Sequence, residues 1–250
     1  MSTRMQAPRR PPERRGPPSS SPSATRYRLA WWTGVGLVVA LVVAIAVAVV
    51  GAAGDDPAPP ATGSELVAPR GLTPDGWIAV GDGPVTVTVY FDYLCPACAA
   101  FERANGDELE RLLEAGDITV ELRPIAFLDH LSAGSEYSTR SASALATVFD
   151  DDPALVWRFH RALYADQPAE GEAGHTDEQL AAIARDAGVP AEVASRFADH
   201  RYSAWVVERT ERAFAEGVRA TPTILIDGEV FEGDPYSVGP LTTAVEQGHG

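Results

Sequence analysis

The pattern of apolar and polar positions predicts one helix with a strand before it and a second strand after it. Residues 85–91 (VTVTVYF) alternate threonine with β-branched and aromatic side chains, and residues 118–122 (ITVEL) alternate in a similar way, which is typical of β-strands. Between them, apolar residues recur at helical spacing from Phe101 to Leu113, and Gly116 ends the predicted helix. A strand, a helix and a second strand in this order indicate a βαβ unit.

The pattern from about residue 131 to residue 216 is helical, and strands return after it. Thr176 and Gln179 have the spacing of a capping box, which predicts the start of one of these helices. Residues 223–226 (TILI) and 229–231 (EVF) are separated by Asp227-Gly228, a pair that favours a two-residue hairpin turn. A short helix around residues 241–246 is expected to follow the hairpin.

The first part of the chain has a different pattern. Residues 29–54 contain no charged residue, and at about 1.5 Å per residue a helix of this length exceeds the roughly 30 Å of bilayer hydrocarbon. We expect a transmembrane helix there, preceded by a disordered cytoplasmic tail (1–28) and followed by a linker (55–75) and one extracytoplasmic domain (76–250). A cleaved signal peptide is the alternative, because residues 51–53 (GAA) are small, but its apolar region is normally about 7–15 residues long.

Charge is divided unevenly along the 250 residues, whose formal net charge is −15. Residues 1–30 contain seven arginines and one glutamate, a net +6, so the remainder carries −21. Binding to phosphates needs a basic face. The acidic main body therefore excludes nucleic acid as the principal partner.

The only two cysteines form a Cys-x-x-Cys motif directly after the first predicted strand. Cys95 lies where the helix begins, and Pro96 takes the first helical position, where its missing N–H costs nothing. Free backbone N–H groups and the positive end of the helix dipole favour a thiolate at Cys95, and a thiolate is the species that attacks disulfides. Cys98 is then placed to resolve the mixed disulfide. A structural disulfide would close a short loop and stabilise little, and a zinc site lacks two further ligands at suitable spacing among the five histidines.

A second signal lies in Ala220-Thr221-Pro222-Thr223, just before the strand 223–226. Together with the Cys-x-x-Cys motif it resembles the thioredoxin superfamily, and the string 95–102 (CPACAAFE) is similar to DsbA-like thiol:disulfide oxidoreductases. The resemblance implies an α/β thioredoxin fold, with a central mixed sheet flanked by helices and an inserted all-helical subdomain at about 131–200. It also implies a cis peptide at Thr221–Pro222 that faces the cysteines and binds the substrate backbone. Ala97 departs from the family pattern, because the best-known oxidases have a histidine there that helps to hold the thiolate.

The resemblance further implies an enzyme that introduces disulfides into secreted or cell-envelope proteins, and the uncharged segment 29–54 is expected to anchor it in the membrane. A quinone-linked thiol oxidase of the membrane is the expected partner for reoxidation. No metal is expected, and no cofactor beyond the redox-active Cys95–Cys98 disulfide. A reductase or isomerase that uses the same residues is an alternative, as is a redox-inactive binding or chaperone module on the same scaffold.

Two carboxylates flank the motif. Glu102 and, with less support, Asp92 are candidates for moving a proton to or from Cys98. Solvated or helix-capping carboxylates are the alternative for both. Three aromatic residues of the helical stretch are expected to belong to the core rather than to a substrate groove: Trp157, Phe159 and Tyr164.

Overall fold

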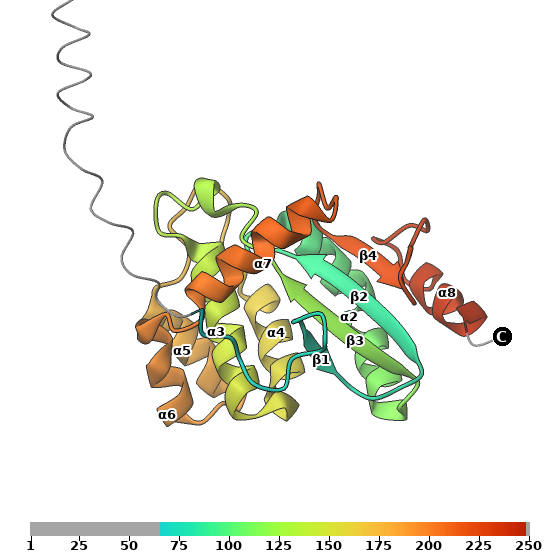
Figure 1. Ribbon diagram of the computed structural model, residues 1–250, viewed down its shortest axis with the longest axis horizontal. Helices are drawn as coiled ribbons and strands as arrows, with labels where there is room; N and C mark the ends of the chain where they lie inside the picture. The colour runs from blue at the N-terminus through green and yellow to red at the C-terminus, as the bar shows by residue number, and fades with distance from the viewer. Residues whose placement is uncertain (1–65, 249–250) are drawn as a thin grey trace, which may run out of the picture. The chain divides into compact units, whose positions relative to one another are not determined.

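The computed structural model describes residues 66–248, and its elements follow the predicted order (Figure 1). The strands are β1 (Ile78–Val80), β2 (Val85–Phe91), β3 (Ile118–Pro124), β4 (Thr223–Ile226) and β5 (Glu229–Val230). The helices are α2 (Pro96–Ala115), α3 (Tyr137–Asp151), α4 (Val156–Ala165), α5 (Asp177–Asp186), α6 (Ala191–Ala194), α7 (Ser203–Ala215) and α8 (Pro240–Gly248). Short 3₁₀ turns occur at Asp129–Leu131, Pro153–Leu155 and Ser195–Asp199.

The five strands form one mixed sheet in the order β1-β3-β2-β4-β5. The pair β2 and β3 is parallel, as the predicted βαβ unit requires, and the other three pairs are antiparallel. The hairpin of β4 and β5 turns at Asp227 and Gly228, both of which have positive φ, as a turn of this kind needs. The sheet thus confirms the predicted mixed, thioredoxin-like architecture.

Both faces of the sheet are covered because the central strand β2 alternates between two apolar clusters. Val87, Val89 and Phe91 face the larger cluster, to which α2 and α8 also contribute side chains. Tyr90 points to the opposite face, where it packs in a smaller cluster with residues of α7 and with Trp77. A strand has a side-chain period of two, so alternate residues serve the two layers.

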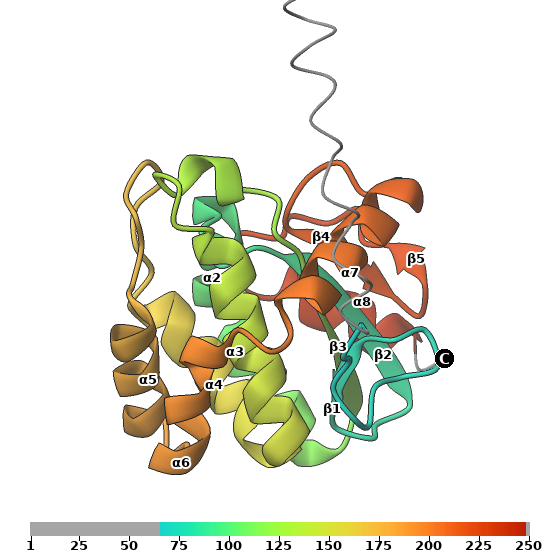
Figure 2. The same ribbon diagram turned by 60° about the vertical axis from the view of Figure 1, so that its left-hand side comes forward.

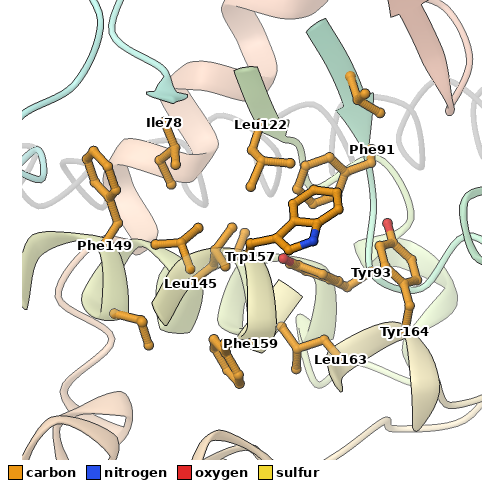
Figure 3. Close-up of a cluster of buried hydrophobic side chains, with 14 of the residues drawn as sticks. Ile78, Phe91, Tyr93, Leu122, Leu145, Phe149, Trp157, Phe159, Leu163 and Tyr164 are labelled. Atoms are coloured by element: carbon orange, nitrogen blue, oxygen red, sulfur yellow. The ribbon is translucent and has the colours of Figure 1, made fainter. Parts of the chain in front are cut away.

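Helices α3 to α6 lie between β3 and β4 in sequence and gather on one side of the sheet, as both views show (Figures 1 and 2). Their core is continuous with that of the sheet: in Figure 3, side chains of α3 and α4 face Ile78 of β1 and Leu122 of β3. The three aromatic residues expected in the core, Trp157, Phe159 and Tyr164, are all buried in this cluster. The helical insertion and the sheet therefore form one packed body.

Two expectations about the N-terminal side need correction. Residues 66–75 were expected to be part of a linker, but Arg70 bonds to Asp150 at the end of α3 through its backbone N–H and its guanidinium, and Leu72 packs against the core. The folded body therefore includes these residues. The strand β1 was not predicted, because three residues are too few to show a period.

The predicted tail, transmembrane helix and first part of the linker lie outside the described residues. Within residues 66–248, no helix is long and apolar enough to cross a membrane.

Candidate active site

The two cysteines lie where β2 passes into α2, as the sequence predicts. Cys95 is the N-cap residue of α2, with φ −75° and ψ 117°, and no side-chain oxygen caps this helix. Pro96 takes the first helical position and is exposed, and Ala97 is half-buried. Both cysteines are free thiols. Cys95 is 7% exposed, against 1% for Cys98, so the difference in access between the two sulfurs is small.

The loop before β4 lies next to the two cysteines. The peptide bond between Thr221 and Pro222 is cis, which confirms the prediction. The Cys95 thiol donates to the backbone carbonyl of Thr221, with 3.4 Å between sulfur and oxygen. The Thr221 hydroxyl is buried without a conventional hydrogen bond, but it lies close enough to both sulfurs to lower the pKa of each. Residues 126 positions apart in sequence thus meet at one site.

Hydrogen bonds and burial shift the pKa values of the two thiols in opposite directions. A hydrogen bond from Cys98 is the largest contribution that lowers the pKa of Cys95, to about 6, and Thr221 and the backbone N–H groups of Cys98 and Ala97 lower it further against the opposing effect of burial. Burial raises the pKa of Cys98 well above 9. At neutral pH, Cys95 is therefore largely a thiolate that accepts from the Cys98 thiol, and the bond to the Thr221 carbonyl belongs to the protonated form of Cys95.

Asp92 is a buried carboxylate that holds the active-site turn together. Its oxygens accept from the backbone N–H groups of Leu94 and Leu128 and from the Ser138 hydroxyl, each at 2.7 Å. Burial outweighs these three bonds and raises the pKa of Asp92 to about 6. The structure rules out the alternative of a solvated Asp92, because this carboxylate joins the turn to the segment after β3 and to α3.

Glu102 is also buried, and α4 supplies its partners. Arg161 Nε donates to Glu102 Oε1 at 3.2 Å, and His160 Nε2 lies 3.5 Å from Oε2. Glu102, His160 and Cys98 line the same cavity of about 10 Å³, which has room for about one water molecule. The structure therefore brings the predicted carboxylate and the resolving thiol to one enclosed space and rules out a solvated Glu102.

Three polar side chains of this region were not singled out from the sequence as site residues: His160, Tyr164 and Gln167. His160 Nδ1 lies 2.9 Å from the Tyr93 hydroxyl, and Tyr164 donates to the backbone carbonyl of Asp92. Figure 3 shows Tyr93 and Tyr164 near each other within this cluster. His160 and Tyr164 lie four residues apart on one face of α4, and Gln167 follows just after the end of this helix. That spacing alone does not distinguish a polar face that serves an active site from an ordinary core face.

Among the described residues, no group of three or more histidine, cysteine or acidic side chains has the geometry to hold a metal ion. The chemistry that the arrangement supports is thiol–disulfide exchange. It combines a thiolate at a helix N-terminus, a buried partner thiol and a carboxylate within the same cavity as that partner.

Comparison with known proteins agrees with this chemistry. The profile of the thioredoxin family matches residues 75–246, which is more than two thirds of the chain. The chain belongs to the thioredoxin family. Among solved structures, this family member is similar to the disulfide bond oxidoreductase DsbG of Mycobacterium tuberculosis, with 31% identity, a TM-score of 0.58 and coverage of 74% of this chain and 84% of DsbG. It is also similar to DsbA from the same organism, with 30% identity, a TM-score of 0.58 and coverage of 74% and 89%.

From these two matches, the chain is a DsbA-like thiol-disulfide oxidoreductase.

Two curated relatives match shorter segments of the chain. The serine/threonine-protein kinase PknE of Mycobacterium tuberculosis is 30% identical over 129 residues, and the chain spans only 23% of that kinase's length. Disulfide bond formation protein D of Bacillus subtilis is 24% identical over 154 residues, which cover 60% of this chain and 67% of the relative.

The opposite pKa shifts predict that only Cys95 reacts rapidly with an alkylating agent near neutral pH. The alkylation rate of Cys95 by iodoacetamide should rise with a midpoint near pH 6, because the thiolate is the nucleophile. Cys98 should stay almost unmodified at that pH. Mass spectrometry of the alkylated peptide separates the two sites, and equal labelling of both cysteines at pH 7 would contradict the assignment.

The raised pKa of Asp92 predicts a stability that falls as pH rises. Between the unfolded value of 3.8 and the folded value of about 6, the folded state binds the proton more tightly. Raising the pH from 4 to 7 should therefore cost the native protein about 2 kcal/mol relative to Asp92→Asn, which cannot ionise. Urea unfolding of both proteins at several pH values measures this difference. A difference that does not change with pH would show that Asp92 is not protonated in this range.

Proposed function

We propose that the protein donates its Cys95–Cys98 disulfide to cysteine pairs of secreted or cell-envelope proteins. The observation that carries the proposal is the pair of opposite pKa shifts. A low pKa at Cys95 stabilises the reduced form, and a stable reduced form makes the disulfide a better oxidant. The relative from Bacillus subtilis is a disulfide bond formation protein, which supports electron flow from substrate to enzyme.

The exchange takes place in two steps. A substrate thiolate attacks Cys95 Sγ, the Cys95–Cys98 bond breaks, and Cys98 leaves as a thiolate that takes up a proton. A second substrate thiolate then attacks the substrate sulfur of the mixed disulfide and releases Cys95 as a thiolate. Two electrons pass from the substrate to the enzyme. Thr221, whose carbonyl lies 3.4 Å from the Cys95 sulfur, and the adjacent Pro222 hold the substrate backbone during both steps.

Oxidising compartments are where disulfides form and persist, so we place the domain outside the cytoplasm, tethered by the uncharged segment 29–54. The reduced enzyme then needs an oxidant, and a quinone-linked thiol oxidase of the same membrane is the proposed partner. This placement agrees with the arginine-rich flank 1–28, because positive charge stays on the cytoplasmic side.

Replacing Cys98 with alanine should trap mixed disulfides between Cys95 and envelope proteins. The trapped species should be found in the membrane fraction and be degraded when protease is added to cells without a wall. Cys95→Ala is the control and should trap few partners, because burial keeps the pKa of Cys98 well above 9 and this cysteine is not a thiolate at neutral pH. Equal trapping by the two variants would contradict the roles, and trapped species that resist the protease would contradict the location.

The reduction potential should lie between about −270 mV, as in thioredoxin, and about −120 mV, as in the strong oxidant DsbA. The Cys95 pKa of about 6 lies between the values near 7 and near 3.5 of those two proteins. Ala97→His should move the potential towards the oxidising end, because an imidazole N–H then donates to the thiolate. Equilibration with glutathione measures both proteins. Ala97→Leu is the control, since it adds volume without a donor, and an equal shift in that variant would contradict the explanation.

We further propose that Glu102 exchanges the proton with Cys98 as this thiol is formed or consumed. Both side chains line the small cavity, and Arg161 links Glu102 to the more exposed Glu110. Glu102→Gln should slow thiol–disulfide exchange by about 100-fold and change its pH profile, as expected when a general acid or base is lost. Glu110→Gln also removes a carboxylate from Arg161 and is the matched control. Equal rates and pH profiles in the two variants would refute the role.

A further inference from the structure

The backbone carbonyl groups of the active-site turn bond to side chains of the helical insertion. The Tyr164 hydroxyl donates to the carbonyl of Asp92 at 3.2 Å. Gln167, just after α4, donates from Nε2 to the carbonyl of Tyr93 at 3.0 Å and to that of Cys95 at 2.9 Å. One face of the insertion therefore follows the turn from Asp92 to Cys95.

Gln167 uses one amide nitrogen for two carbonyl groups. An amide NH₂ has two hydrogens, so both bonds can be satisfied at the same time. The side chain is half-buried and neutral, and it lies 72 residues from Cys95 in sequence. It thus fixes the backbone on both sides of Leu94 without placing a charge beside the thiolate.

The orientation of the Cys95 carbonyl matters because Cys95 caps α2. Its carbonyl also accepts the N–H of Ala99, at 3.2 Å, in the first turn of the helix. Rotation about ψ of Cys95 turns this carbonyl and the helix relative to the side chain. A bond that holds the carbonyl therefore also holds the sulfur against the N–H groups of Ala97 and Cys98, which stabilise the thiolate.

We propose that Gln167 is a positioning residue for Cys95, through which the helical insertion helps to set the reactivity of the sulfur that exchanges with the substrate. The inference deepens the proposed function and rests on it in one respect, namely that the mixed disulfide forms at Cys95. It assigns to the insertion a part in the chemistry in addition to its part in the core.

Gln167→Met tests this role, because methionine has a similar length and no N–H donor. In the full-length protein, the midpoint of Cys95 alkylation by iodoacetamide should rise by about one pH unit, as the sulfur loses its fixed place at the helix end. At pH 7, a rise from about 6 by one unit lowers the equilibrium constant for reduction by glutathione about fivefold. Gln167→Glu should raise the midpoint at least as much, because a carboxylate then faces two carbonyl groups and the thiolate.

Gln179→Ala is the matched control. It removes another glutamine hydrogen bond from the same insertion, in the capping box of α5, and should leave the Cys95 midpoint and the glutathione equilibrium unchanged. A midpoint in both Gln167 variants equal to that of the wild type, or a shift of the same size in Gln179→Ala, would overturn the inference. A wild-type protein that shows no low midpoint and no exchange with glutathione would instead contradict the proposed function.

Discussion

The site depends on the absence of an ordinary cap at the start of α2. A helix begins with backbone N–H groups that have no partner within the helix, and a serine, threonine or aspartate usually supplies one. Here the N-cap residue is Cys95, and only its sulfur can serve. A thiolate accepts these N–H groups far better than a sulfur in a disulfide does. Reduction therefore completes the helix and oxidation leaves it uncapped, which couples the stability of α2 to the redox state of the pair.

A thiolate in a partly buried site also requires that the nearby carboxylates do not oppose it. Two of them lie close in sequence, and both are buried. Three donors satisfy Asp92, and Arg161 together with His160 faces Glu102. Most of these partners come from the segment after β3 and from helices α3 and α4. Without the insertion, Asp92 would lose the Ser138 hydroxyl and Glu102 would lose both Arg161 and His160, so the insertion stabilises the two carboxylates much as α2 stabilises the sulfur.

Features that depend on neighbouring residues could be predicted from the sequence, whereas contacts between residues far apart in the sequence could not. The strands 85–91 and 223–226 and the Cys-x-x-Cys placement depend on neighbouring residues, so local periodicity showed them. The cis peptide before Pro222 came from the family resemblance, because no local pattern specifies it. The bonds of Gln167 and His160 to the active-site turn join positions 67 to 74 residues apart, and a single sequence has no signal for such pairs. Glu102 was a candidate from its place beside the motif, but its burial and its partners on α4 were not predicted, because a carboxylate usually lies in solvent.

The same reasoning bears on how redox strength varies among proteins with this motif. The dipeptide between the cysteines acts on the sulfur from α2, and here Ala97 contributes only its backbone N–H. The Thr221 side chain lowers the same pKa from the loop before β4, and Gln167 bonds to the Cys95 backbone from the insertion. Segments outside the motif therefore act on the attached sulfur as well as the dipeptide, the insertion doing so through the position of the Cys95 backbone that we propose. Two proteins with identical dipeptides need not have the same potential, because a donor lost between the cysteines can be offset by contacts that lie far away in the sequence.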